Sequence, residues 1–194
     1  MTTLIKKYND ARVYLINDAN MVQKMALSIL FAIILAIASQ IKIFLSFTPV
    51  PINLGTFAVC MAGMTLGGFW GFISVAIYML AAAVGLPVIA GANFLGATTG
   101  YIVGYSICAF ALGKWTEKSD IKKYSFIKNS AVLFIFQIAI IHICGMIGLY
   151  LWSVSIGSPY TLTEVIMKGT VPFLLTDSIK AMVLSLSMGF ILKK

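Results

Sequence analysis

Residues 43–113 decide the fold, and they read IFLSFTPVPINLGTFAVCMAGMTLGGFWGFISVAIYMLAAAVGLPVIAGANFLGATTGYIVGYSICAFALG. This stretch contains no Asp, Glu, Lys or Arg. The whole chain of 194 residues is 60% hydrophobic and only 10% charged, whereas soluble domains carry about 25% charged residues. Its mean hydropathy is +0.99. The composition therefore predicts an all-α integral membrane protein.

Six segments of the chain are apolar enough to enter a bilayer. We expect transmembrane helices at 21–44, 54–66, 69–84, 97–115, 130–152 and 172–192. The second segment is short for a span, since crossing the hydrocarbon takes about 20 residues. The pair Gly67-Gly68 predicts a tight hairpin between the second and third segments. The sequence thus predicts one membrane domain of six helices over residues 21–194.

The charged residues indicate how the chain is oriented. The net charge is +8, and lysines gather in residues 114–128, between the fourth and fifth spans. Cytoplasmic loops carry such an excess, which explains the charge without nucleic acid. Six spans then place both termini in the cytoplasm. Residues 1–20 form either an amphipathic helix at the membrane surface or a solvated tail, and we expect the protein in the cell (plasma) membrane.

Several kinds of chemistry have no signature in this sequence. The three cysteines, Cys60, Cys108 and Cys144, lie in apolar runs without CxxC spacing, so we expect neither disulfides nor a metal site. No Walker motif, zinc-protease motif or nucleophile elbow is found. We therefore predict no cofactor and no ATP hydrolysis by this chain. If this chain captures a molecule for uptake, a partner protein must supply the energy.

Charged residues stand at the start of the last apolar segment, where residues 172–180 read PFLLTDSIK. If Pro172 opens a helix, Asp177 and Lys180 fall on one face inside the bilayer. Intramembrane charges cost roughly 2.5–3.5 kcal/mol each and often mark a substrate site. A structural ion pair is the alternative. His142, near the middle of the fifth span, fits a neutral packing histidine better than a proton relay.

The loop at residues 85–96 is too apolar for an ordinary solvated loop and too rich in glycine for a stable helix. Irregular backbone at membrane depth is tolerated where it is buried in protein or lines a cavity. This loop is therefore a candidate wall of a binding site. With the orientation given above, the loop and the Asp177–Lys180 pair lie toward the outer face, where a molecule from outside the cell can reach them.

Four segments of the chain resemble a known family. They are PVPINL at 49–54, AVGLPV at 83–88, GATTGY at 96–101, and Pro172-Phe173 followed by Asp177 and Lys180. They look like the biotin-binding S subunits of energy-coupling-factor (ECF) transporters, the BioY family, in order and at matching separations over about residues 20–192. The chain departs from the family at Leu175 and Thr176, usually Pro and Gly, and at Gly55, usually Gln. Its GATTGY is usually GPTGGY.

The resemblance implies a six-helix S-component fold that binds biotin from outside and is not an enzyme. It also implies docking on a transmembrane coupling subunit driven by two ATP-binding subunits. The spacing of Ala32 and Ala36 by itself favours internal packing of small residues. The resemblance raises these two residues to a candidate docking surface for the coupling subunit.

The same resemblance suggests how biotin would be held. Asp177 and Lys180 suit the N–H and carbonyl groups of the ureido ring, although Lys180 could instead bind the carboxylate. The remaining candidates are Gly91 and Asn93 of the loop with Thr98, Thr99 and Gly100, which would supply amides and hydroxyls to the carboxylate at a helix N-terminus. Capping is the alternative for Asn93 and Thr99.

Other side chains and other functions stay open at this point. An aromatic wall could be formed by Tyr101, Tyr150, Trp152 and Tyr160, but aromatic residues are common at membrane interfaces. Lys42 fits a snorkelling lysine better than a ligand. The chain could be an S component for another water-soluble vitamin. A membrane enzyme using Asp177 and Lys180 is a more remote alternative.

Overall fold

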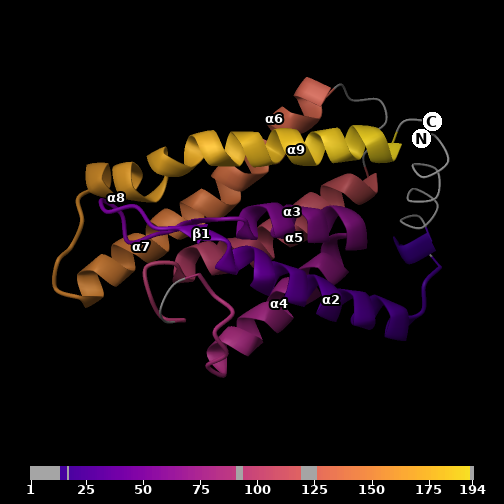
Figure 1. Cartoon of the computed structure of the whole chain (residues 1–194), viewed down its shortest axis with the longest axis horizontal. Helices are drawn as coiled ribbons and strands as arrows, with labels where there is room; N and C mark the ends of the chain where they lie inside the picture. Colours follow the sequence, from indigo (N-terminus) through magenta and orange to yellow (C-terminus); the bar gives the residue numbers. More distant parts are fainter. Residues whose placement is uncertain (1–13, 17, 91–93, 119–125, 193–194) are drawn as a thin grey trace.

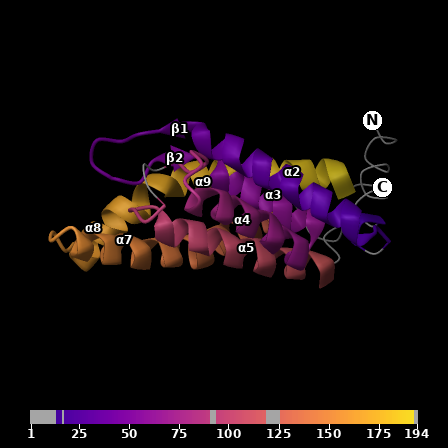
Figure 2. The ribbon, with the colours of Figure 1, turned by 90° about the horizontal axis from the view of Figure 1, so that it is seen from below.

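The computed structural model describes residues 14–16, 18–90, 94–118 and 126–192. The predicted N-terminal segment 1–20 therefore lies mostly outside the described residues. The described helices are α2 (Met21–Gln40), α3 (Gly55–Leu66), α4 (Gly68–Ala83), α5 (Thr99–Lys118), α6 (Phe126–Phe136), the π-helix η2 (Gln137–His142), α7 (Ile143–Ser155), α8 (Leu162–Gly169), the 3₁₀ helix η3 (Val171–Phe173) and α9 (Leu174–Leu192). The long helices run side by side along the long axis of the molecule (Figures 1 and 2).

Three helical segments in the described part of the chain are long and apolar enough to cross a membrane: Met21–Gln40, Phe126–Ser155 and Leu162–Leu186. Helices α3 and α4 are apolar but shorter. The α3–α4 hairpin turns at Gly67, whose φ of 83° favours glycine. The structure thus supports a helical membrane protein.

The connection after α2 differs from the expected continuous span to residue 44. The helix ends at Gln40, and β1 (Lys42–Ile43) pairs antiparallel with β2 (Ile52–Asn53). Two prolines in residues 44–51 prevent a helix there, so the chain folds back as a short ribbon. This ribbon brings Asn53 to the start of α3.

The polar connection between the fifth and sixth spans contains an amphipathic helix that we did not predict. Helix α8 begins with a capping box, in which the Thr161 side chain accepts from the Glu164 backbone and Glu164 accepts from the Thr161 backbone. Pro172 lies in η3, directly before α9. Figure 1 shows α8 at one end of the molecule and the start of α2 at the other.

Helix α5 packs in the centre of the bundle, against α3, α4 and α7. Glycines allow close approaches to α7 and to α4. A Cβ built on Gly148 of α7 would lie 2.5 Å from the Cα of Gly100, and a Cβ on Gly113 would lie 2.5 Å from the Cα of Gly68. Glycine at these positions lets neighbouring helix backbones touch, as small residues do inside membranes.

Candidate functional site

The candidate site is a cavity between the helices, where the β1–β2 ribbon, the residues Ala90 and Thr98, and α9 meet. The space between its walls, counted with its open mouth, is about 500 Å³. The residues that line it are Ser39, Val50, Pro51, Asn53, Thr56, Tyr78, Ala90, Thr98, Tyr101, Ile102, Tyr105, Ile141, His142, Phe173, Asp177 and Lys180. Most of the lining surface is apolar, although many of these side chains also carry a polar atom.

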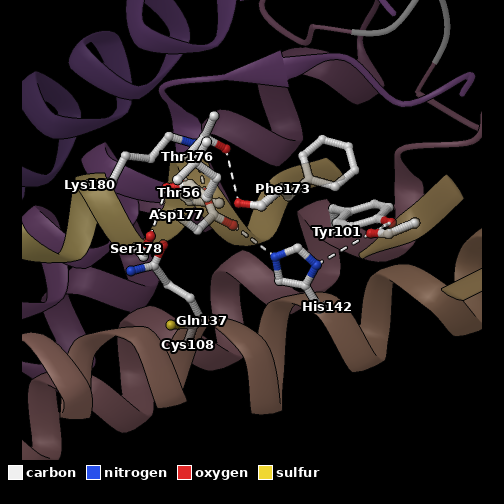
Figure 3. A network of polar contacts seen from close by, with 12 residues as sticks. Thr56, Tyr101, Cys108, Gln137, His142, Phe173, Thr176, Asp177, Ser178 and Lys180 are labelled. Atoms are coloured by element: carbon white, nitrogen blue, oxygen red, sulfur yellow. Dashed lines mark hydrogen bonds and ion pairs between the residues drawn. The ribbon is translucent and has the colours of Figure 1, made fainter. Parts of the chain in front are cut away.

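The charged residues predicted from the sequence meet in this cavity. Lys180 Nζ lies 2.8 Å from Asp177 Oδ1. Both residues are buried, Lys180 with 7% and Asp177 with 1% of its surface exposed. Thr56 of α3 bridges them, because its hydroxyl donates to Asp177 Oδ1 at 3.2 Å and accepts from Lys180 Nζ at 3.0 Å. Figure 3 shows these side chains converging. The spacing of three residues on α9 thus yields a buried ion pair that Thr56 of the neighbouring helix α3 holds.

His142 belongs to the same cluster, which the sequence did not predict. Its Nε2 lies 2.8 Å from Asp177 Oδ2, and its side chain is 2% exposed (Figure 3). His142 ends the π-helix η2, and π-helical turns are frequent at functional sites. We call Thr56, His142, Asp177 and Lys180 the ion-pair cluster. A histidine inside an apolar span was a signal in the sequence for a functional residue. The π-helix η2 changes the direction in which the following residues point, and the sequence did not reveal that change.

The ion-pair cluster is linked to the C-terminal end of α8. The carbonyl oxygen of Gly169 accepts from the Tyr101 hydroxyl at 2.6 Å and lies 3.3 Å from His142 Nδ1. The rings of Tyr101 and Phe173 flank the imidazole, with centroids 6.0 and 5.8 Å away. Four elements, α5, η2, α8 and η3, therefore fix the position of the histidine.

A count of donors and acceptors shows what the ion-pair cluster can still bind. Among the described residues, Asp177 Oδ1 receives two hydrogen bonds and Oδ2 receives one. Each carboxylate oxygen can accept two, and an ammonium group donates three. Lys180 Nζ gives one bond to Asp177 and one to Thr56. One acceptor position on Oδ2 and one donor on Nζ therefore remain for a ligand.

A second set of polar groups lines the cavity with fewer partners. Thr98 is 7% exposed, and its Oγ1 has no hydrogen-bond partner in the described structure. Asn53 Oδ1 accepts from Gly55 N at 2.7 Å and from the Tyr105 hydroxyl at 3.5 Å. The Asn53 amide nitrogen has no partner among the described residues. We call Asn53, Thr98 and Tyr105 the hydroxyl–amide set.

The other loop candidates lie in different places. Gly91 and Asn93 fall outside the described residues. The Thr99 hydroxyl donates toward the carbonyls of Phe94 and Gly96 at 2.6 and 2.9 Å and accepts from Gly96 N, so it holds the loop together. Gly100 faces α7 rather than the cavity lining, since a Cβ there would overlap the carbonyl oxygen of Cys144. Of the predicted loop residues, the structure brings Thr98 to the cavity.

Among the aromatic candidates, Tyr101 lines the cavity and Tyr150, Trp152 and Tyr160 do not. The last two contact each other with ring centroids 6.4 Å apart. Lys42 Nζ donates to the carbonyl of Ala90 at 3.2 Å and so braces the loop.

The small-residue stripe on α2 faces inward. Ala32 is 5% exposed within the chain's own core, and Ala36 is partly buried against that core. Its role in docking stays a prediction.

The arrangement is that of a helical membrane protein with a cavity between its helices and a buried ion pair in the cavity wall. A family model of the BioY family matches residues 7–193. The chain is 34% identical over 173 residues to a protein of Rhizobium etli named "Biotin transporter BioY", covering 84% of this chain and 89% of the relative. It is 38% identical over 96 residues to a Pyrococcus horikoshii protein named "Probable biotin transporter BioY", covering 47% of this chain but 58% of that protein.

A solved structure is also similar. The crystal structure of the S-component for biotin from an ECF-type ABC transporter superposes with a TM-score of 0.72 at 28% sequence identity, covering 87% of this chain and 89% of that one. The chain belongs to the BioY family. The resemblance inferred from its motifs is confirmed, and these relatives are described as transport proteins, not enzymes.

Proposed function

We propose that this chain is the biotin-binding S subunit of an ECF-type transporter, which captures biotin from outside the cell. The family and the similar S-component support this assignment. The observation that carries it is the buried ion-pair cluster, which offers one acceptor beside one donor inside a mostly apolar cavity. A ureido ring presents the complement, an N–H donor next to a carbonyl acceptor.

The ureido ring of biotin binds the ion-pair cluster in this proposal. Asp177 Oδ2 accepts from a ring N–H, and Lys180 Nζ donates to the ring carbonyl. Such charge-assisted bonds are worth about 1.5–3 kcal/mol each. A site built this way rejects analogues that lack the N–H or the carbonyl, because the buried charges then stay unsatisfied.

The carboxylate end lies toward the hydroxyl–amide set. Thr98 Oγ1 is a buried hydroxyl without a partner, and the Asn53 amide nitrogen can donate. Gly91, Asn93, Thr99 and Gly100 stay candidates for the loop that surrounds this end. Donors around the start of α5 would complement an anion.

We also propose the finer topology and the partners. Six transmembrane helices form a single S-component domain in the cell membrane. Both termini lie in the cytoplasm, because the basic loop is placed on the cytoplasmic side by the positive-inside tendency. A transmembrane coupling subunit and two ATP-binding subunits supply the energy. Because Ala32 is buried in the core, Ala36 is the residue of the stripe better placed to contact a partner.

Equilibrium binding of biotin to the detergent-purified protein tests the assignment. We expect tight binding by the wild type and a loss of roughly tenfold to 150-fold for Asp177→Asn and for Lys180→Ala. Lys114→Ala is the matched control, since Lys114 pairs with Glu117 outside the cavity and should bind as the wild type does.

Two results would contradict the proposal. Wild-type protein that fails to bind biotin but binds another water-soluble vitamin in a competition series would reassign the ligand. Unchanged binding in both cavity variants would make the ion pair structural.

A further inference from the structure

His142 is the single histidine of the chain, and both of its ring nitrogens face oxygen acceptors. Nε2 faces the Asp177 carboxylate at 2.8 Å, and Nδ1 faces the Gly169 carbonyl at 3.3 Å. A neutral imidazole carries one N–H, whereas the imidazolium carries two. The neutral ring can therefore satisfy one of the two acceptors and turns a lone pair toward the other.

The groups around the ring decide the effect of the second proton. From α9 the ring meets Asp177, with Lys180 on the far carboxylate oxygen. Tyr101 of α5 approaches edge-on, Phe173 comes from η3, and α8 contributes the Gly169 carbonyl. The charges of Asp177 and Lys180 cancel. When His142 is protonated, the ion-pair cluster therefore carries a net charge of about +1, with Asp177 and Lys180 both ionised.

We propose that His142 is a positioning residue which, as the imidazolium, holds the Asp177 carboxylate and makes the cavity selective for an anionic ligand. The inference rests on the proposed function and names a property of the same site. The Nε2–H fixes one lone pair of Oδ2 and leaves the other for the ligand. The Nδ1–H anchors the ring on α8, so the ring cannot turn away from Asp177.

Proton and ligand then favour each other. An anion in the cavity stabilises the imidazolium, and by reciprocity the imidazolium strengthens binding of the anion. Affinity for biotin should rise as the pH falls through the titration of the ring, by at most about tenfold per pH unit for one coupled proton. The neutral amide of biotin should show a weaker dependence, because it keeps the contact to Asp177 but lacks the charge.

The single histidine makes the test direct. Protein labelled with ¹⁵N-histidine and purified through a tag without histidine gives imidazole signals from His142 alone. In the ligand-free protein we expect the ring to gain one proton as the pH is lowered, which leaves both nitrogens protonated, and we expect Asp177→Asn to change that titration. Adding biotin should move the wild-type titration to higher pH. A titration that neither Asp177→Asn nor biotin moves would overturn the inference.

Binding curves supply the second readout. His142→Gln keeps a donor for Asp177 but cannot titrate, so its affinity for biotin should lose the dependence on pH that the wild type shows. A His142→Gln variant that keeps the wild-type slope would refute the role of the ring. If the wild type does not bind biotin, the proposed function fails, and the ligand-free titration of wild type and Asp177→Asn still decides whether His142 is held by the carboxylate.

Discussion

The two polar parts of the cavity are built in opposite ways. In the ion-pair cluster each side chain already has partners: Lys180, His142 and Thr56 all hydrogen-bond Asp177. In the hydroxyl–amide set the Thr98 hydroxyl is buried and has no partner in the described part of the chain. A buried polar group costs free energy unless it is hydrogen-bonded. The first part is therefore preorganised by the fold, whereas in our proposal a ligand completes the second.

The largest effect on stability should come from breaking the ion-pair cluster on one side. Asp177→Leu leaves the Lys180 ammonium and the His142 donor buried without their acceptor. Breaking a buried pair by removing one partner costs about 3–5 kcal/mol. We expect a clear drop in the melting temperature of the ligand-free protein in detergent.

The double variant Asp177→Leu/Lys180→Met is the control for this prediction. It removes both charges and should recover most of the lost stability while still failing to bind biotin, because apolar replacements of a buried pair are often neutral. If the double variant is less stable than the single one, the cluster is not held together by the pair.

The sequence predicted that Asp177 and Lys180 lie together because residues three apart on one helix share a face, whatever surrounds them. It also predicted the hairpin at Gly67, where the backbone requires glycine. Both features depend on local geometry. His142 and Thr56 join the site through contacts between helices, which depend on how the spans rotate against each other. The π-helix before His142 changes that rotation within a span, and periodicity along the sequence does not reveal it.

Helix α8 was missed for a different reason. Its capping box, with Thr161 and Glu164 three residues apart, is a local signal that was available in the sequence. We interpreted this segment as a polar connection between spans and therefore did not predict the helix. Thr98 and Thr99 show the opposite case, since the Thr99 hydroxyl bonds the Phe94 carbonyl while the Thr98 hydroxyl has no partner among the described residues. Sequence alone could not separate them.

Gly100, two residues beyond Thr98, tests where the hydroxyl–amide set ends and helix packing begins. Gly100→Ala should destabilise the protein by about 1–3 kcal/mol, as overpacking does, because the added methyl group meets the backbone of α7 at Cys144 and Gly148. Thermal unfolding of the ligand-free protein measures this effect. Val103→Ala, on the exposed side of α5, should change the melting temperature little. A Gly100→Ala protein as stable as the wild type but poor in biotin binding would instead place Gly100 in the ligand site.

The smallest and most specific effect should come from the pair Thr98→Val and Thr99→Val. Thr98→Val removes a hydroxyl that has no partner among the described residues, so biotin affinity should fall by about tenfold, the value of one neutral hydrogen bond. The ligand-free protein should stay as stable as the wild type or gain stability. Thr99→Val removes the bonds to Phe94 and Gly96, so it should lower the melting temperature. Measuring both quantities for both variants separates the residue that meets the ligand from the residue that shapes its loop. If Thr98→Val lowers stability and leaves affinity unchanged, the hydroxyl serves the fold and the contrast between the two parts of the cavity is lost.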